Sequence, residues 1–146
     1  MTELIAGAAM LIAIVCLVLV RRVRAVEKRL AFAQQRSDLI TVLLETKLLL
    51  RAEVLPLGEL APVSLSPRCR SRIGELVRKT GRLQTELAEQ RVRLDGLLIP
   101  EAISPVDHAE LGSVATRIQE LAGDGAWLVD QSRAVRVDLE AAAAPY

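Results

Sequence analysis

The sequence predicts an all-α protein in which a single N-terminal transmembrane helix continues into a cytoplasmic antiparallel helical bundle or coiled coil of about three helices. Three observations carry this prediction. Residues 4–20 contain no charged side chain, no Pro precedes Pro56, and two later segments place apolar residues three and four positions apart. The 146 residues suffice for such an anchor and one small domain.

Changes in composition divide the chain into four parts. Residues 1–24 form a predicted transmembrane anchor with a basic flank, and residues 25–54 form a stalk and the first bundle helix. Residues 55–70 are a Pro-rich apolar connector, and residues 71–146 are the two-helix, heptad-patterned remainder of the bundle.

The predicted anchor is the apolar segment 4–20. As a helix its 17 residues span about 25 Å, slightly less than the ~30 Å hydrocarbon core, and Arg21 and Arg22 can extend to the lipid headgroups. A cleaved signal peptide is the alternative. The segment lacks the basic start and the small-residue cleavage site of such peptides, so we favour an uncleaved anchor.

Basic residues directly after the apolar segment predict its orientation. They are Arg21, Arg22, Arg24, Lys28 and Arg29, whereas only Glu3 and the amino terminus carry charge before the segment. The positive-inside rule then predicts the N-terminus outside the cell inner (plasma) membrane and the C-terminal domain in the cytoplasm. These cations can also touch anionic lipid headgroups, although we favour a role in stop-transfer and topology alone. The 16 Arg and three Lys are typical of a GC-rich bacterial genome.

Small residues recur along one side of the predicted anchor. Their spacing of three and four places them in one narrow stripe on a helix, and they are Ala6, Ala9, Ala13 and Cys16. Such a stripe lets a second membrane helix approach closely. Alanine is also common in membrane segments, so the pattern leaves open whether the stripe contacts a partner.

The first helix is expected to run without interruption to about Val54, because Pro56 is the first helix breaker. Between Leu39 and Leu50 its apolar residues cover more than half of the circumference, which predicts the central helix of the domain. The connector that follows contains Pro56, Pro62 and Pro67, and we expect it to be non-helical and packed along the helices, or else bound in a partner's groove.

A second helix is predicted from near Ser71 to before Pro100. Its heptad positions form an apolar seam of Ile73, Leu76, Leu83, Leu87 and Leu94. Two further heptad positions in this seam are polar, Thr80 and Gln90.

A third helix should begin at Ser104-Pro105, a Ser cap followed by Pro at the first helical position. Gly125 and Ser132 share its seam, whose apolar members are Leu111, Val114, Ile118, Leu121, Leu128 and Val135. Because the heptad phase continues through Gly123-Asp124-Gly125, we favour a kinked or weakened helix over two helices. The seams can close within one chain or between chains, and the hairpin-length connectors favour the first.

Residues that would indicate chemistry are scarce. The single His108 follows Asp107 at a helix start, and two Cys and one His cannot complete a zinc site within one chain. We therefore expect no catalytic, cofactor-binding or metal-binding residues, no small-molecule substrate and no enzymatic activity. Residues 101–146 hold eight acids against three Arg, which argues against nucleic-acid binding.

Three functions are compatible with this organisation. The first is a non-catalytic accessory or scaffold subunit of a larger membrane complex, such as a transporter or an envelope assembly, bound to a polytopic partner. The second is a self-oligomerising membrane protein with a cytoplasmic coiled coil, either holin-like or a divisome organiser. The third is a membrane-tethered regulator that binds a soluble cytoplasmic protein.

Overall fold

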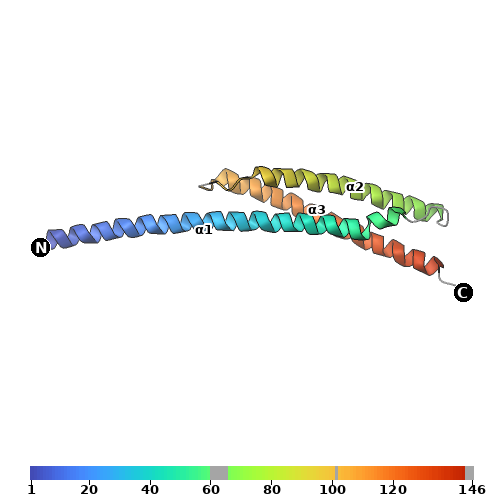
Figure 1. Cartoon of the computed structure of the whole chain (residues 1–146), viewed down its shortest axis with the longest axis horizontal. Coiled ribbons are helices and arrows are strands. Elements are labelled where there is room, and N and C mark those ends of the chain that lie inside the picture. Colours follow the sequence, from blue (N-terminus) through green and yellow to red (C-terminus); the bar gives the residue numbers. More distant parts are fainter. Residues whose placement is uncertain (60–65, 101, 144–146) are drawn as a thin grey trace.

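The computed structural model describes residues 1–59, 66–100 and 102–143. Helix α1 spans Thr2–Glu53, a short 3₁₀ helix η1 spans Leu55–Glu59, α2 spans Pro67–Gly96 and α3 spans Pro105–Ala143. The three long helices pack together (Figure 1). The described residues contain no strand, so the predicted all-helical class is confirmed.

The three helices run alternately along one axis. Helices α1 and α3 point in the same direction, and α2 runs antiparallel to both of them (Figure 1). The N-terminal half of α1 extends alone beyond the other two helices. Contacts at the ends agree with this arrangement, because Arg36 of α1 contacts Leu94 near the end of α2, and Ser132 of α3 contacts Glu53 at the end of α1.

Helix α1 changes surroundings at Phe32 although its backbone continues unbroken. Residues 2–31 are all exposed. Phe32 retains only 2% of its surface and lies edge-on to the ring of His108, with ring centroids 6.3 Å apart. From there Leu39, Leu43 and Leu50 are buried against α2 and α3. One half of α1 is therefore bare and the other half is part of a packed core.

The core between the helices is formed by residues that recur every three or four positions. In α2 the buried residues are Ile73, Leu76, Thr80, Leu83, Leu87, Gln90 and Leu94. In α3 they include Leu111, Val114, Ile118, Leu121, Gly125, Leu128, Ser132 and Val135. Each helix thus turns one stripe toward its neighbours, and burying these side chains provides the main driving force for packing.

Helix α2 begins earlier than expected, at Pro67 and not near Ser71. The Ser66 hydroxyl accepts a hydrogen bond from the backbone N–H of Cys69 at 3.2 Å, and Pro67 occupies the first turn. The connector is also partly helical, because residues 55–59 form η1 with Leu57 buried. The rest of the predicted connector, up to residue 65, lies outside the described residues.

Helix α1 packs against both α2 and α3, yet part of its predicted apolar stripe stays uncovered. Its side chains Leu44, Leu48 and Leu49 remain exposed, with exposed fractions of 48%, 62% and 48%. Two neighbouring helices cover only one side of a third, so an apolar stripe wider than half the circumference keeps an uncovered edge.

Helix α3 passes through Gly123 and Gly125 as one helix, so the alternative of two separate helices is wrong. Gly125 is buried, and a Cβ atom there would lie 2.8 Å from Thr46 Cγ2 of α1 and 3.6 Å from Leu83 Cδ2 of α2. The Thr46 hydroxyl donates to the carbonyl oxygen of Val42 at 2.8 Å, which holds its rotamer. Gly125 therefore allows close approach of all three helices.

This contact predicts opposite effects for two neighbouring glycines. Gly125→Ala should lower the free energy of unfolding by about 1–3 kcal/mol, because the methyl group overpacks the contact with Thr46. Gly123→Ala is the matched control. No atom lies within 4 Å of its Cβ position, so it should raise stability by about 0.4–1 kcal/mol.

The measurement is urea-induced unfolding of the full chain in detergent micelles, followed by far-UV circular dichroism. Equal shifts in both variants would mean that α1 and α3 do not meet closely at Gly125.

Candidate functional site

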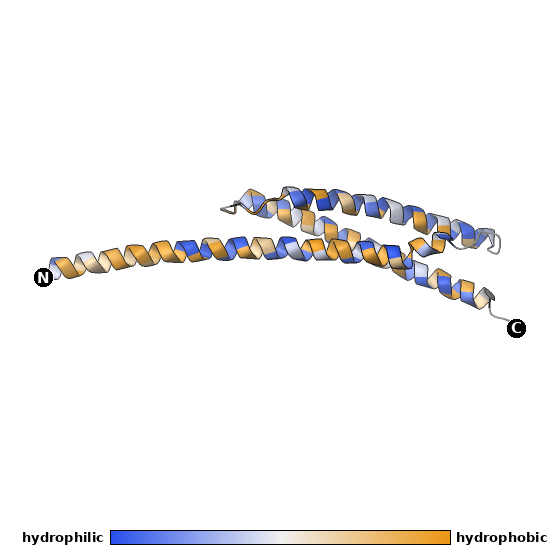
Figure 2. Cartoon of the chain, viewed as in Figure 1, coloured by the Kyte–Doolittle hydropathy of each residue, from blue (hydrophilic) through white to orange (hydrophobic). Residues whose placement is uncertain are grey.

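The first candidate site is the bare N-terminal half of α1. By length and composition it is the one helix among the described residues that could cross a membrane. An 18-residue window within it has a mean hydropathy of 2.7, and none of that window is buried. Hydrophobic residues surround the helix on all sides there, whereas polar residues first appear in number at the basic segment (Figure 2).

The small residues predicted to pack against another membrane helix all lie on this bare half. Ala6, Ala9, Ala13 and Cys16 are exposed. No other helix of the described chain approaches them, since packing on α1 begins at Phe32. The stripe is therefore available to lipid or to another molecule.

The basic residues after this segment divide into two groups. Arg21, Arg24 and Lys28 line an open hollow of about 270 Å³ together with Ala102 and Ile103 from the turn between α2 and α3. Arg22 and Arg29 are also exposed but do not line this hollow. The structure therefore places one face of the basic segment beside a turn that is some 75 residues away in the sequence.

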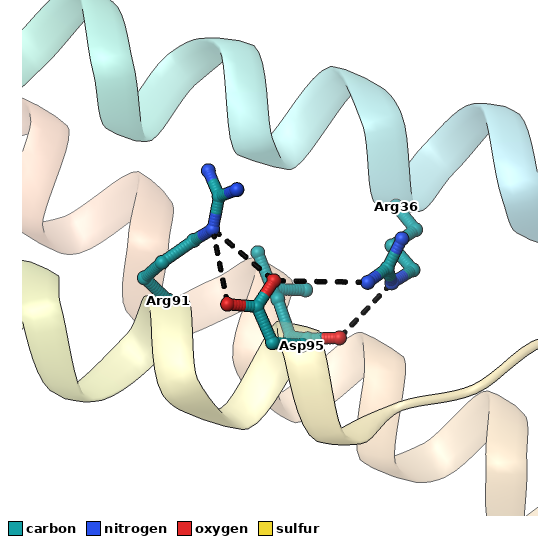
Figure 3. Close-up of polar contacts among 4 residues, drawn as sticks. Arg36, Arg91 and Asp95 are labelled. Carbon is teal, nitrogen blue, oxygen red and sulfur yellow. Dashed lines mark hydrogen bonds and ion pairs between the residues drawn. The ribbon is translucent and has the colours of Figure 1, made fainter.

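An arginine of α1 holds the C-terminal end of α2 (Figure 3). The guanidinium Nε of Arg36 donates to the carbonyl oxygen of Leu94 at 2.9 Å, and its terminal nitrogen lies 3.8 Å from a carboxylate oxygen of Asp95. Asp95 also accepts from Arg91 Nε at 3.2 Å within α2. The Leu94 carbonyl oxygen also accepts from the backbone N–H of Leu97 at 3.1 Å, and Arg36 adds a charged donor from α1 at this helix end, where the helix dipole favours a cation. Arg36 therefore ties the end of α2 to α1.

The C-terminal end of α1 is held in the same way by α3. The Ser132 hydroxyl donates to the carbonyl oxygen of Glu53 at 2.6 Å, and the Arg136 guanidinium donates to the same oxygen at 2.8 Å. Ser132 is completely buried in the seam. Sequence analysis missed both caps. For the second cap, the available signal was the polar residue Ser132 at a seam position. Its partner, the carbonyl oxygen of Glu53, could not be identified without the fold.

The start of α3 is closed by a reciprocal cap. The Asp107 carboxylate accepts from the backbone N–H and from the hydroxyl of Ser104, both at 2.8 Å, while the Ser104 hydroxyl accepts from the Asp107 N–H at 3.2 Å. The hydrogen bond from the Ser104 backbone, followed by that from its hydroxyl, lowers the pKa of Asp107 below its ordinary value. The stabilisation from this cap is present above the unfolded-state pKa and is lost as the pH falls through the folded-state pKa.

Further hollows on the surface of the packed helices include two that involve α2. One of about 300 Å³ runs between α1 and α2 and is lined by Leu43, Leu44 and Val92 among others, with Val92 71% exposed. The other, about 280 Å³, lies between α2 and α3 beside Trp127. The ammonium of Lys79 sits 5.0 Å from the centre of the Trp127 ring. The first hollow includes Leu44, one of the uncovered leucines of α1, and is the more apolar surface.

Within residues 1–59, 66–100 and 102–143, no group of three or more His, Cys, Asp or Glu side chains could hold a metal ion. No protein-family model matches the chain, and neither the search of curated proteins nor that of solved structures finds a match. The arguments for function therefore rest on the geometry described above.

The cap on α2 predicts unequal effects for two arginines that both contact Asp95. Arg36→Met should lower the free energy of unfolding by about 1–2 kcal/mol. Hydrogen bonds from a charged donor contribute roughly 1.5–3 kcal/mol, and the value expected here is lower because 25% of the Arg36 side-chain surface is exposed to solvent. Arg91→Met, the matched control, loses only an exposed pair within α2 and should change stability by less than about 0.5 kcal/mol.

Urea unfolding of the full chain in detergent measures both values. Hydrogen exchange adds a local readout, in which the amides of Leu97 and Leu98 lose protection in Arg36→Met alone. A loss of stability as large in Arg91→Met would contradict a specific cap by Arg36.

Proposed function

We propose that this chain is a non-catalytic, single-pass membrane protein that acts as an accessory or scaffold subunit of a larger membrane complex. In this role its N-terminal helix crosses the membrane once, and the three packed helices present a rigid surface to partner proteins. A polytopic membrane protein is the partner that fits best, because it can contact both the membrane helix and the packed helices.

The observation that carries the proposal is the division of α1 at Phe32. A bare apolar half and a buried half belong to one helix without a break. An exposed apolar segment of this size is unfavourable in water and favourable in lipid. A continuous helix also fixes the distance between the membrane segment and the packed core. This suits a subunit that holds partner proteins at a fixed distance from the membrane.

Orientation follows from charge. The exposed cations after the apolar segment favour the cytoplasm for the packed helices and the outside for the N-terminus. We therefore place the protein in the cell inner membrane with residues 25–146 in the cytoplasm.

Two surfaces are available for association in this arrangement. One is the stripe of small residues on the membrane helix, and the other is the apolar hollow between α1 and α2, where Leu44 and Val92 are exposed. The second surface also favours the alternative, a self-oligomerising membrane protein, because two copies could cover this apolar edge for each other.

Replacing two small residues of the stripe should release the partner. In Ala9→Leu/Ala13→Leu the larger side chains hold a neighbouring helix away, so a partner that co-purifies with the wild-type chain in mild detergent should be lost. Ala8→Leu is the matched control, since it adds the same side chain on another side of the helix. Mass spectrometry of the affinity-purified particle measures the outcome.

A wild-type particle that contains only copies of this chain would contradict the accessory-subunit proposal and support self-oligomerisation. Equal loss of the partner in Ala8→Leu would exclude the stripe as the contact.

The native thiols test the orientation without any substitution. Cys69 lies near the start of α2 and is partly exposed, whereas Cys16 lies within the proposed span. A membrane-impermeant maleimide should leave Cys69 unlabelled in intact cells and label it after the membrane is permeabilised. Labelling of Cys69 in intact cells would show that the packed helices are outside, opposite to the proposal.

A further inference from the structure

The turn between α2 and α3 has an inner face and an outer face, both apolar. Leu97 and Ile103 pack against the core. Leu98 is 81% exposed, Ile99 is 42% exposed, and Val106 in the first turn of α3 is 65% exposed. The core does not require these outward-facing side chains, so another environment must account for such a concentration of apolar residues on a turn.

The position of this turn along α1 suggests what that environment is. The turn closes the end of the α2–α3 pair that points toward the bare half of α1 (Figure 1). Its residues Ala102 and Ile103 share a hollow with Arg21, Arg24 and Lys28. Lys28 is the eighth residue after Val20, and Arg21 is the first, so this hollow extends from the end of the apolar segment to about 12 Å beyond it along the helix. The headgroup layer of a bilayer covers roughly the first 5–7 Å of this distance.

The cations beside the turn have no partner in the described part of the chain. Arg21, Arg24 and Lys28 are exposed and make neither an ion pair nor a side-chain hydrogen bond with the described residues. Anionic headgroups at this level would pair with them. The turn itself contains one acid in the sequence, Glu101, so attraction to anionic lipid comes from α1, and the apolar side chains are the contribution of the turn.

The turn is also held in place before any membrane contact. Arg36 binds the carbonyl oxygen of Leu94 just before it, and the reciprocal cap between Ser104 and Asp107 closes its other side. A turn fixed at both ends loses little conformational freedom when it binds a surface.

We propose that the α2–α3 turn is a second membrane contact, in which Leu98 and Ile99 enter the bilayer interface while Arg21, Arg24 and Lys28 of α1 bind the phosphate of anionic lipid headgroups. This inference rests on the proposed membrane span of α1. It makes the packed helices lie against the inner surface of the membrane at one end and leaves their other end, near Pro67, in water.

Spin labels on the full chain in phosphatidylcholine–phosphatidylglycerol vesicles test the position of the turn. The parent is Cys16→Ser/Cys69→Ser, and single labels are placed by Leu98→Cys, Ile12→Cys and Ser71→Cys. Oxygen and a water-soluble nickel chelate report lipid and water exposure. We expect the Ile12 label to be in lipid, the Ser71 label in water, and the Leu98 label to be shielded from nickel and accessible to oxygen at an intermediate depth.

The three labels separate the two hypotheses. A Leu98 label as accessible to nickel as the Ser71 label, with the Ile12 label in lipid, would overturn the turn contact and leave the membrane span intact. An Ile12 label in water would overturn the span, and with it this inference. Ile99→Cys is a second position for the turn label if Leu98→Cys does not fold.

The cations are tested separately by native mass spectrometry of the detergent-solubilised full chain with added phosphatidylglycerol or phosphatidylcholine. We expect retained phosphatidylglycerol to be lost in Arg24→Gln/Lys28→Gln and kept in Arg78→Gln, an exposed arginine of α2 outside this hollow. An excess of inorganic phosphate distinguishes two kinds of site. At a site for free phosphate it would displace the bound phosphatidylglycerol, whereas at a lipid site the phosphatidylglycerol would stay bound. Equal retention of both lipids by the wild-type chain, or displacement by phosphate, would overturn the headgroup site.

Discussion

The uninterrupted backbone of α1 is the constraint on which the other features depend. Its hydrogen bonds continue from Thr2 to Glu53, through the apolar segment, the basic segment and the buried segment that begins at Phe32. Because an α-helix advances 1.5 Å per residue, the distance from Val20 to Phe32 is set by residue count alone. A hinge between those residues would leave the height of the core above the proposed span undetermined, and the α2–α3 turn would have no defined position beside the basic segment.

Polar caps from neighbouring helices decide how the helices are aligned along their axes. An apolar seam that repeats every seven residues is nearly as well buried after a shift of one heptad, so apolar packing by itself specifies alignment weakly. Arg36 on the carbonyl of Leu94 and Ser132 on the carbonyl of Glu53 join specific atoms at opposite ends of the structure. A shift would break both of these hydrogen bonds between helices. Gly125 adds a third point, since a Cβ atom at this position would lie 2.8 Å from Thr46 Cγ2.

Much of the fold could be predicted from residue pattern because periodicity reports directly on which side of a helix is buried. The start of α3 at Ser104-Pro105 follows from local capping chemistry, and the Ser66-Pro67 pair carries the same signal for the start of α2. Gly125 was harder. In sequence it resembles a helix breaker, and its role as a contact depends on Thr46, which is distant along the chain. The hollow between the basic segment and the α2–α3 turn was not predictable for the same reason.

The sequence by itself determined the helical class, the extent of the apolar segment and the faces that each helix buries, because these depend on neighbours within one or two turns. Only the tertiary structure decided that α1 keeps an uncovered apolar edge and that Arg36 binds the end of α2. It also decided that the turn carrying the exposed Leu98 and Ile99 shares a hollow with the basic residues of α1 through Ala102 and Ile103. These features join residues far apart in the chain. Their spacing is set by how three helices align, which no local pattern of side chains encodes.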